Sequence, residues 1–477
     1  MYGFHRDNCR SDCIDQLDRK VATDTLPDEV LFHTFYFYVN QTWDEDAWHT
    51  LVHVCQQWRY VVFASPKRLN LRLHCTHGRA VKNMLDVWPL SLPIVISDHD
   101  LHTTPPELEG AKIFIAALKH RDRISAIDLA AWLWEPIVAM TEPFPVLTSL
   151  RLHSWAMGLN LVLPDSFMGG SCPRLQVLHL DEIPFPGVGK LLLSTSDLTG
   201  LYLQEIPYSG YIAPEAMITY LSTLTKLESF DLGFRSPRSR AKRANRRPPT
   251  VTRIVLAALT EFQFKGDSAY LEEIVSRIDA PLLDTFTITF FDCLVLDTPQ
   301  LRHFISHTEK FTALHRADVL FHGDYHDIGV TFSPSGGLRP TDRGTLTLGV
   351  LYSDLGPGFM SLVRLCSSAW PPLPTLERLS ALNYVSSRQP RIAVTEWVEF
   401  LRVFIFVKDL DLFGGLSYQI MNALRELAGE GVIEVLPALQ NIFVHELWTS
   451  DDILKSIEPF VAARQLSGHP VAVHRLK

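Results

Sequence analysis

The chain has 477 residues, of which 47% are hydrophobic and 20% are charged, and its formal net charge is −9. This length exceeds the size at which one compact core stops growing, so we expect several domains or an open-ended array of repeats. No apolar run reaches the roughly 18 residues of a membrane span, and the negative charge disfavours a general polyanion binder. The first residues, MYGFHRDNCRSDCID, lack the apolar core of a secretory signal, and seven cysteines are a sparse, odd set for a disulfide framework. We therefore expect a cytoplasmic or nuclear protein, or both, with no membrane partner.

Two helices are predicted near the start of the chain. Residues 25–39, TLPDEVLFHTFYFYV, begin with Pro27, which suits a first helical turn, and with Asp28 and Glu29, whose charges favour the positive end of the helix dipole. Residues 48–63, WHTLVHVCQQWRYVVF, show helical spacing of apolar residues, so the two helices can pack together. Their apolar positions outnumber what one internal interface can cover, which favours a partner for the remainder.

Residues 24–66 resemble the F-box motif, with LPDEVL at its head and VCQQWRYVVF as its closing stretch. In F-box proteins this three-helix unit docks on the Skp adaptor of a cullin-RING ubiquitin ligase, which would account for the excess of apolar surface. The alternative is that the same positions form the core of an ordinary helical cap. The resemblance implies a Skp-adaptor-binding or motif-core role for the residues at the matching positions: Leu26, Pro27, Val30, Leu31, Val54, Cys55, Trp58 and Val61.

A six-position pattern, apolar-x-x-apolar-x-apolar, recurs through the rest of the chain. From Ile124 to Leu283 the intervals between successive starts are 23, 28, 23, 29, 32 and 24 residues. Such spacing is typical of leucine-rich repeats. We therefore predict an α/β fold in which residues 67–477 form an irregular leucine-rich-repeat solenoid, with parallel strands on a concave face and helices outside. The matches are ISAIDL from Ile124, LTSLRL from Leu147, LQVLHL from Leu175, LTGLYL from Leu198, LESFDL from Leu227, LTEFQF from Leu259, LDTFTI from Leu283, VKDLDL from Val407 and LQNIFV from Leu439.

The segments around these strands complete the predicted repeats. LNLRLHC, residues 69–75, alternates apolar and polar residues and predicts the first strand. The pattern fails in residues 311–375, which include the turn-rich stretch 333–344, so we expect distorted or interrupted repeats there. Helical spacing predicts outer helices in residues 214–224, 270–278, 395–404 and 451–463.

One polar position in each repeat strand should point away from the core and line the concave face. The resulting mixture of charged, aromatic and amide groups suits recognition of a protein target. The alternative is an ordinary solvated sheet face. The predicted target-binding residues are Asp128, Arg151, His179, Tyr202, Asp231, Gln263, Thr287, Asp411 and Phe443.

The sequence carries no motif typical of an enzyme, because it lacks a P-loop, a GxGxxG after a strand, a GxSxG elbow, an HExxH and a CxxC pair. Cys9 and Cys13 form one spaced pair without a second half, so we expect neither a metal site nor a cofactor. Residues 1–23 are expected to be a disordered tail.

Residues 235–249, RSPRSRAKRANRRPP, form a predicted insertion with seven basic residues directly after the LESFDL strand. Such a cluster can act as a nuclear-import signal or as a contact for an anionic partner. A solvated, disordered loop between repeats is the simpler interpretation, and it makes nucleic acid a disfavoured partner.

These features predict the substrate-recognition adaptor of an SCF-type (Skp-cullin-F-box) ubiquitin ligase, similar in plan to the expanded F-box family of mushroom-forming fungi. The F-box would dock the Skp adaptor, the solenoid would hold an unknown protein target, and other subunits would transfer ubiquitin. Two alternatives remain: an interaction scaffold that works without any ligase, and a nucleic-acid-associated protein that uses the basic insertion.

Overall fold

The structure is a computed structural model that divides into two compact units, residues 1–129 and 130–477. The first unit therefore extends past residue 66, where the sequence resemblance ends. The predicted tail, residues 1–23, lies outside the described residues, as does most of the predicted basic insertion. The structure describes residues 26–41, 47–76, 88–89, 91–98, 108–130, 133–154, 162–237, 253–291, 298–322, 327–334, 344–352, 355–368, 375–383, 391–414, 416–428, 431–445 and 451–476.

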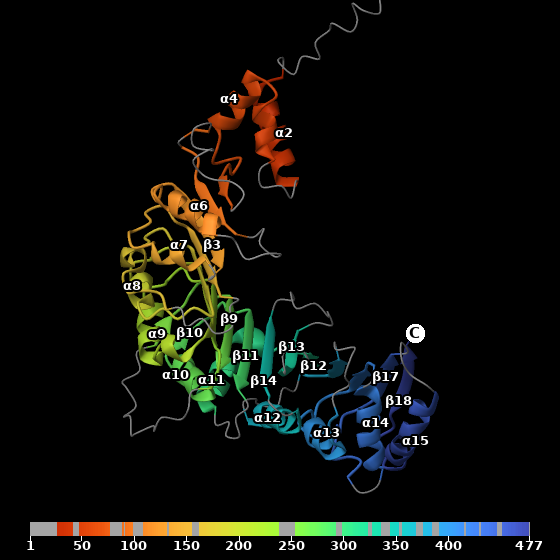
Figure 1. The fold of residues 1–477 in the computed structure, drawn as a ribbon. Coiled ribbons are helices and arrows are strands. Elements are labelled where there is room, and N and C mark those ends of the chain that lie inside the picture. Colours follow the sequence, from red (N-terminus) through yellow and green to blue (C-terminus); the bar gives the residue numbers. More distant parts are fainter. Residues whose placement is uncertain are drawn as a thin grey trace, which may run out of the picture. The chain divides into compact units, whose positions relative to one another are not determined.

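In the described part of the first unit, α2, α3 and α4 come before the parallel strands, and α6 lies between the second and third of those strands in the chain (Figure 1). The strands β1, β2 and β3 pair in that order, with Leu73 opposite Ile94 and Ile94 opposite Ile124. The first of them is shorter than the predicted strand 69–75. The elements are α2 (Asp28–Gln41), α3 (Trp48–Val52), α4 (Gln56–Ala64), β1 (Leu73–Cys75), β2 (Ile94–Ser97), α6 (Leu108–Leu118) and β3 (Ile124–Ala130).

Specific contacts hold α2, α3 and α4 together. The rings of Phe35 on α2 and Trp58 on α4 lie 4.7 Å apart between centroids. Arg59 Nε donates a hydrogen bond of 2.9 Å to the carbonyl of Val52, which ties α4 back to the end of α3. Cys55 is the N-cap of α4, and its Sγ accepts a hydrogen bond from the backbone N–H of Trp58. The Cys-x-x-Trp spacing in the sequence is thus a helix-capping arrangement as well as a motif.

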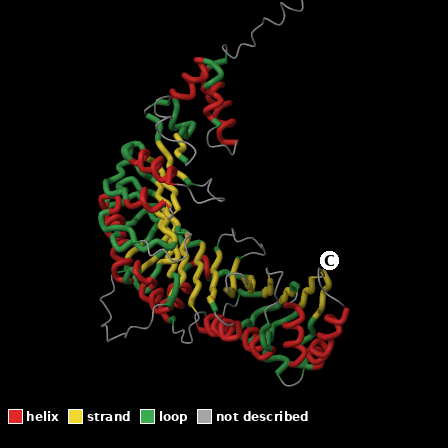
Figure 2. The backbone as a smooth tube through the Cα atoms, in the orientation of Figure 1, coloured by secondary structure: helices red, strands yellow, loops and turns green. Residues whose placement is uncertain are grey.

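The second unit contains one long sheet that is mostly parallel, and helices that lie along one of its faces (Figures 1 and 2). Its strands neighbour one another in the order β4-β5-β6-β7-β9-β11-β14-β13-β12-β15-β16-β17-β18, while β8 and β10 pair separately. The strands are β4 (Ser149–His153), β5 (Val177–Asp181), β6 (Gly200–Ile206), β7 (Ser229–Phe234), β8 (Ile254–Val255), β9 (Glu261–Gly266), β10 (Ile278–Asp279), β11 (Thr285–Phe291), β12 (Arg316–His322), β13 (Asp327–Ser333), β14 (Thr345–Leu351), β15 (Arg378–Asn383), β16 (Asp409–Leu412), β17 (Asn441–His445) and β18 (Ala472–Leu476).

The helices of the second unit include the four that the sequence predicts, which correspond to α9, α10, α13 and α15. Successive helices pack side by side from α8 to α11 and from α12 to α15, and α10, α12 and α14 also contact strands of the sheet. The helices are α7 (Trp134–Val138), α8 (Val188–Leu193), α9 (Pro214–Leu221), α10 (Ser268–Val275), α11 (Pro299–His307), α12 (Leu355–Ser368), α13 (Val394–Leu401), α14 (Leu416–Glu426) and α15 (Asp451–Leu466), with short 3-10 turns η4 (Phe167–Gly170), η5 (Tyr208–Gly210) and η6 (Glu309–Phe311).

The six-position pattern places its apolar residues in ladders that face the helices. The fourth position of the pattern is paired from strand to strand and buried throughout β4 to β11. Three phenylalanines in this ladder stack, with centroids 5.1 Å apart for Phe230 and Phe262 and 5.0 Å apart for Phe262 and Phe286. A stacked ladder buries large apolar area in every repeat, so it fixes the strand register. Its members are Leu150, Leu178, Leu201, Phe230, Phe262 and Phe286.

The sheet departs from an all-parallel arrangement in its middle. Strand β13 is antiparallel to both β12 and β14, and β14 lies next to β11, so the spatial order of these strands reverses the chain order. This reversal falls in residues 311–375, where the sequence pattern fails. The sheet is therefore mostly but not wholly parallel, because a hairpin here replaces the strand–helix–strand crossover that parallel neighbours require.

Helices of successive repeats also cap one another. Glu272 on α10 accepts hydrogen bonds from the backbone N–H groups of Gln300 and Leu301, at 3.0 and 2.8 Å, in the first turn of α11. Those N–H groups have no partner within their own helix.

Among the described residues, no helix is both long and apolar enough to cross a membrane.

Candidate interaction surfaces

An apolar surface lies on the outer side of α2. Val30 and Phe37 are seven residues apart, which places them on one face of the helix, and they are 46% and 60% exposed. Leu26 precedes the helix and is 41% exposed, and its carbonyl accepts a hydrogen bond from Gln57 on α4. We call Leu26, Val30 and Phe37 the α2 surface. Large apolar side chains gathered in this way are typical of a binding surface.

The structure divides the residues of the F-box resemblance into two groups. Leu31 and Val61 are 1% and 4% exposed and form part of the core between the helices, so they are not available for direct contact with a partner. Cys55 caps α4 and Trp58 packs on Phe35, so both support the helical unit itself. The exposed members are Leu26, Pro27, Val30 and Val54.

The predicted target-binding residues of the second unit form a row across the sheet, on the face opposite the helices. Direct cross-strand pairing joins Arg151 to His179, His179 to Tyr202, Tyr202 to Asp231, Asp231 to Gln263 and Gln263 to Thr287. We call this side of the sheet the open face. The row continues through the central strands to Asp318, Ser380, Asp411 and Phe443.

Asp128, the remaining predicted residue, belongs to the first unit, where it pairs with Ser97 across β2 and β3. It therefore belongs to a different unit from the row on β4 to β18. Two other predicted residues are not solvated: Asp231 and Asp411 are 7% and 1% exposed. The sequence places them on the correct face, but polar neighbours cover both carboxylates.

Asp231 lies in a polar cluster on β5, β6, β7 and β9. Gln204 joins two members of the row, because its Oε1 lies 3.1 Å from His179 Nε2 and its Nε2 donates to Asp231 Oδ2. A β-bulge after Leu203, where Glu205 has a φ of 48°, turns the carboxylate of Glu205 toward Lys265. Burial raises the pKa of Asp231 to about 6, although the hydrogen bond from Gln204 lowers it.

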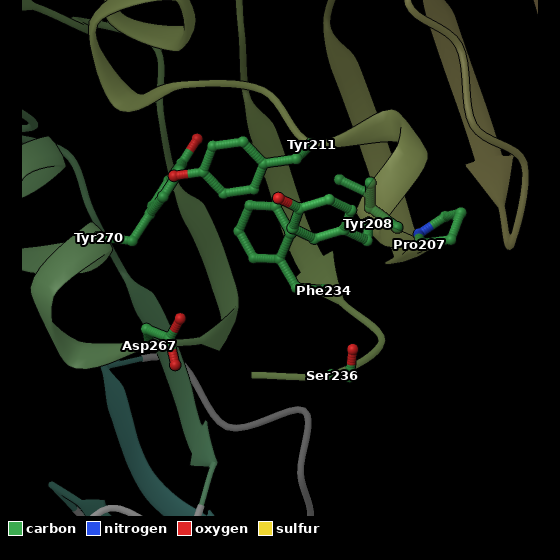
Figure 3. A pocket seen from close by; sticks show the side chains of 8 residues that line it. Pro207, Tyr208, Tyr211, Phe234, Ser236, Asp267 and Tyr270 are labelled. Carbon is green, nitrogen blue, oxygen red and sulfur yellow. The ribbon is translucent and has the colours of Figure 1, made fainter. Parts of the chain in front are cut away.

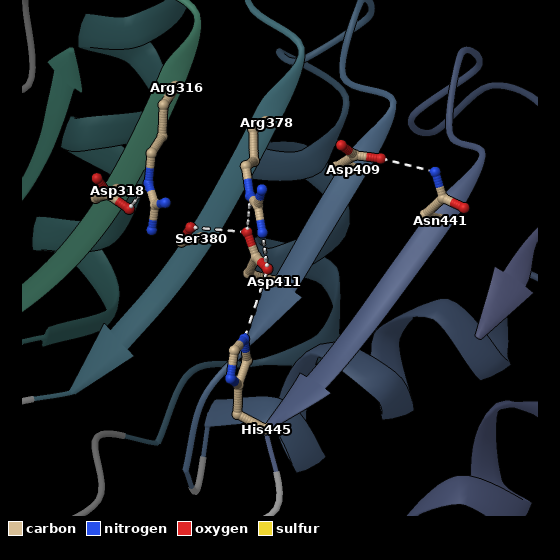
Figure 4. Close-up of polar contacts among 8 residues, drawn as sticks. All are labelled: Arg316, Asp318, Arg378, Ser380, Asp409, Asp411, Asn441 and His445. Atoms are coloured by element: carbon tan, nitrogen blue, oxygen red, sulfur yellow. Dashed lines mark hydrogen bonds and ion pairs between the residues drawn. The ribbon is translucent and has the colours of Figure 1, made fainter. Parts of the chain in front are cut away.

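Asp411 lies in a second polar cluster on β12, β15, β16 and β17 (Figure 4). Arg378 contacts its carboxylate through two guanidinium nitrogens, and Ser380 Oγ donates to it at 3.4 Å. His445 Nε2 lies 3.6 Å from the same carboxylate, and its ring stacks on Phe413. The buried carboxylate therefore has partners from both neighbouring strands, β15 and β17.

The adjacent strand β12 adds a second ion pair to this cluster. Arg316 Nε donates to Asp318 Oδ1 at 2.8 Å, and both side chains are buried. Burial raises the pKa of Asp318, while the hydrogen bond and charge of Arg316 lower it.

Among the described residues, no group of three or more His, Cys, Asp or Glu side chains could hold a metal ion.

The sequence analysis missed Asp318 and Ser380, although a signal for both was present. LHRADV from Leu314 and LERLSA from Leu376 fit the six-position pattern once alanine counts as apolar. The structure buries Ala317 and Ala381 at the corresponding positions. Gln204 and Arg378 had no such signal, because they lie outside the middle position of their strands.

The central strands differ from both clusters, because small side chains cover the open face there. Thr287, Thr347 and Thr331 are paired across β11, β14 and β13, and the hydroxyls of the last two lie 3.0 Å apart. Gly349 pairs with both Thr289 and Gly329. The open face therefore has large polar side chains on either side of a stretch of threonine and glycine.

Comparison with known proteins leaves the family open. No protein-family model matches the chain, and no curated protein matches it. A structural comparison finds the leucine-rich-repeat-containing protein LegL7 from Legionella pneumophila, with a TM-score of 0.26 and 11% sequence identity, covering 83% of this chain and 98% of that chain. A TM-score this low does not establish that the two chains share a fold.

Proposed function

We propose that this chain is the substrate-recognition adaptor of a Skp-cullin-F-box-type ubiquitin ligase. In this proposal residues 24–66 are the F-box, and the open face of the second unit holds a protein target. The observation that carries it is the α2 surface, where Leu26, Val30 and Phe37 remain exposed within the segment that resembles an adaptor-docking unit. The chain would position the target and would leave ubiquitin transfer to other subunits.

The burial of the motif residues supports this proposal over a simple helical cap. A cap needs only the buried and capping positions, such as Leu31, Cys55 and Val61. It gives no reason for large apolar side chains at Val30 and Val54, which are 46% and 56% exposed. An adaptor interface gives that reason, because apolar contacts fill the centre of most protein interfaces.

The test is co-expression of the full chain with a Skp-type adaptor, followed by affinity purification. The double substitution Val30→Asp with Phe37→Asp places two charges on the α2 surface, and we expect it to weaken adaptor binding at least about tenfold. Asn40→Asp is the matched control, because it adds a charge to an exposed position of the same helix outside the α2 surface. Near-UV circular dichroism checks that each variant is folded.

A ligase-independent scaffold is the alternative, and the same experiment decides between the two. If wild-type protein fails to bind the adaptor, or if the double variant binds as well as wild type, the ligase proposal is wrong. Leu31→Asp is unsuitable for this test, because Leu31 is 1% exposed and the substitution would unfold the helical unit.

A further inference from the structure

The aromatic pocket shown in Figure 3 is closely packed and has no room for a ligand. It lies at the carboxyl ends of β6, β7 and β9, and its volume of about 20 Å³ holds about one water molecule. The ring centroids of Tyr211, Phe234 and Tyr270 lie between 4.9 and 5.9 Å apart, so the rings fill the space themselves. Helix α11, which packs beside α10, instead carries two histidines on its exposed side.

These two histidines lie one helical turn apart. His303 and His307 are four residues apart on α11, so they share a face of the helix. Both side chains are exposed, and their ring centroids are 3.9 Å apart. The other side of the helix is buried through Leu301, Phe304 and Ile305. The pair therefore lies on a helix that its packing holds in place.

Hydrogen bonds determine how the His307 ring presents its two nitrogens. Nδ1 lies 2.8 Å from the backbone carbonyl oxygen of His303. A carbonyl oxygen can only accept, so Nδ1 carries the proton, and Nε2 of the neutral ring carries a lone pair. Ser306 Oγ donates its own proton to that carbonyl and lies 3.3 Å from Nδ1, where it can accept. Metal-binding histidines usually donate their other ring N–H in this way, so His307 is oriented as a ligand through Nε2.

The end of α11 also suits a cation. His307 is the last residue of the helix, and the carbonyl groups of a last helical turn carry partial negative charge. Lys310 is paired with Asp284 at 2.8 Å, and Glu309 adds an exposed carboxylate just after the helix. Arg302 lies about 100° around the helix from the histidine that follows it. The neighbouring cations are thus matched by an equal number of carboxylates.

We propose that His303 and His307 together bind one divalent transition-metal ion of the zinc class. Imidazole nitrogen suits zinc, nickel and copper, whereas magnesium and calcium prefer oxygen ligands. Rotation of the exposed His303 side chain lets both rings reach one ion at the usual zinc–nitrogen distance of about 2.0–2.1 Å. Water fills the remaining coordination positions.

The site is distinct from the other features of the chain. It has two side-chain ligands, so it differs from the larger groups excluded above. Its signal in the sequence, the His-x-x-x-His spacing within LRHFISH, was missed by the sequence analysis. It does not depend on the ligase role, because it lies in the second unit and uses no residue of the α2 surface.

The first measurement titrates the full-length protein with Zn²⁺, Ni²⁺ and Mg²⁺ by calorimetry. We expect Zn²⁺ and Ni²⁺ to bind with micromolar dissociation constants and Mg²⁺ to bind at least about a hundredfold more weakly. Histidine-selective ¹³C labelling should show that Zn²⁺ shifts two ring signals, which His303→Gln and His307→Gln assign. Binding of Mg²⁺ as tight as that of Zn²⁺ would show an oxygen-ligand site and would overturn the proposal.

Single substitutions then locate the ion. His303→Gln and His307→Gln each leave one imidazole on the helix, and each should weaken Zn²⁺ binding at least about tenfold. His469→Gln is the matched control and should leave binding unchanged, because His469 is an exposed histidine outside any helix. Circular dichroism checks that each variant is folded. Wild-type affinity in either α11 variant would mean an adventitious ion only, held by other histidines, and would contradict the proposal.

Two double variants separate the spacing of the histidines from their number. His303→Gln with Ser306→His keeps two histidines on α11, but about 100° apart around the helix, so it should bind Zn²⁺ as weakly as His303→Gln alone. His307→Gln with Ser306→His places the pair three residues apart on one face, so it should recover part of the lost affinity. Equal affinity of the two double variants would show that the spacing does not matter, and the proposal would then be wrong.

Discussion

Arg378 Nη2 donates a hydrogen bond of 2.8 Å to Asp411 Oδ1 across β15 and β16, and its Nε contacts the other carboxylate oxygen. Asp411 is 1% exposed, whereas the side chain of Arg378 is 38% exposed. One face of the sheet thus holds a buried anion under a partly solvated cation. Such a bidentate pair fixes both side chains in one geometry, which suits a preformed binding surface.

The first prediction concerns this pair. Asp411→Asn should lower the free energy of unfolding by about 1–3 kcal/mol, because Arg378 loses its anionic partner and one of the two oxygens that accept from it becomes an NH2 group. Asp409→Asn is the control, since Asp409 is less buried and accepts one hydrogen bond from Asn441. Urea unfolding of both variants measures the difference. Equal stability of the two variants would mean that the pair contributes nothing measurable.

The second prediction concerns Asp231, a buried aspartate of the same face whose pKa is raised to about 6 from the ordinary 3.8. Between these two pH values the folded chain holds a proton that the unfolded chain releases, so this group makes the protein less stable as pH rises through that window. Asp231→Asn should therefore stabilise the protein above pH 6, by about 3 kcal/mol at most, and should have little effect near pH 4. Urea unfolding of wild type and variant at pH 4, 6 and 8 measures this trend. A variant that is less stable than wild type at pH 8 would show that the charged form is well compensated.

The two aspartates show what the sequence could and could not predict. Both occupy the middle position of the repeat pattern, LESFDL and VKDLDL, so the sequence placed them on the same face of the sheet. The difference between them depends on residues far away in the chain: Gln204 beside Asp231, and Arg378 beside Asp411. Periodicity predicts which side of a strand a residue faces, but not which side chain of the next strand reaches it.

The strand order was also only partly predictable. The pattern identified the parallel strands from β3 to β11 through their apolar ladders, because each ladder repeats the same burial. It failed at β12 and β15, where Ala317 and Ala381 take the place of a large apolar residue. The hairpin of β12 and β13 could not be found from a repeat, since it breaks the repeat.

On α2 the sequence marked both Val30 and Leu31 for the adaptor, and only the packing of the helices separates the exposed residue from the buried one.

The third prediction concerns Arg464, a fully buried residue of α15 that the sequence analysis did not single out. Its guanidinium donates to the carbonyls of Leu436 and Leu439, at 3.3 and 3.0 Å, and to those of Val432 and Pro437. Arg464→Met keeps most of the volume but removes all of these hydrogen bonds from buried carbonyls. We expect a loss of about 3 kcal/mol or more in the free energy of unfolding.

The measurement for Arg464 is thermal and urea unfolding of the full chain, with Arg425→Met as control. Arg425 is an exposed arginine in the last turn of α14, so its replacement should change stability by less than about 0.5 kcal/mol. A well-folded Arg464→Met protein with wild-type stability would mean that water or the chain itself replaces the lost hydrogen bonds.

The last prediction separates a protein adaptor from a nucleic-acid reader. Strands β7 and β9 are direct neighbours, with Phe230 paired to Phe262, although the basic stretch lies between them in the chain. Deleting residues 238–250 should therefore leave the ladder intact and change stability by less than about 1 kcal/mol, because loop-closure cost depends only weakly on length. Adaptor binding should also survive.

If the basic side chains bind phosphates, wild-type protein should instead bind nucleic acid with an affinity that falls steeply with salt, and the deletion should abolish it. We expect the first outcome, since the chain has a net charge of −9 and the basic stretch contains no aromatic residue to stack on bases. Micromolar, deletion-sensitive binding of nucleic acid at physiological salt would reverse this conclusion.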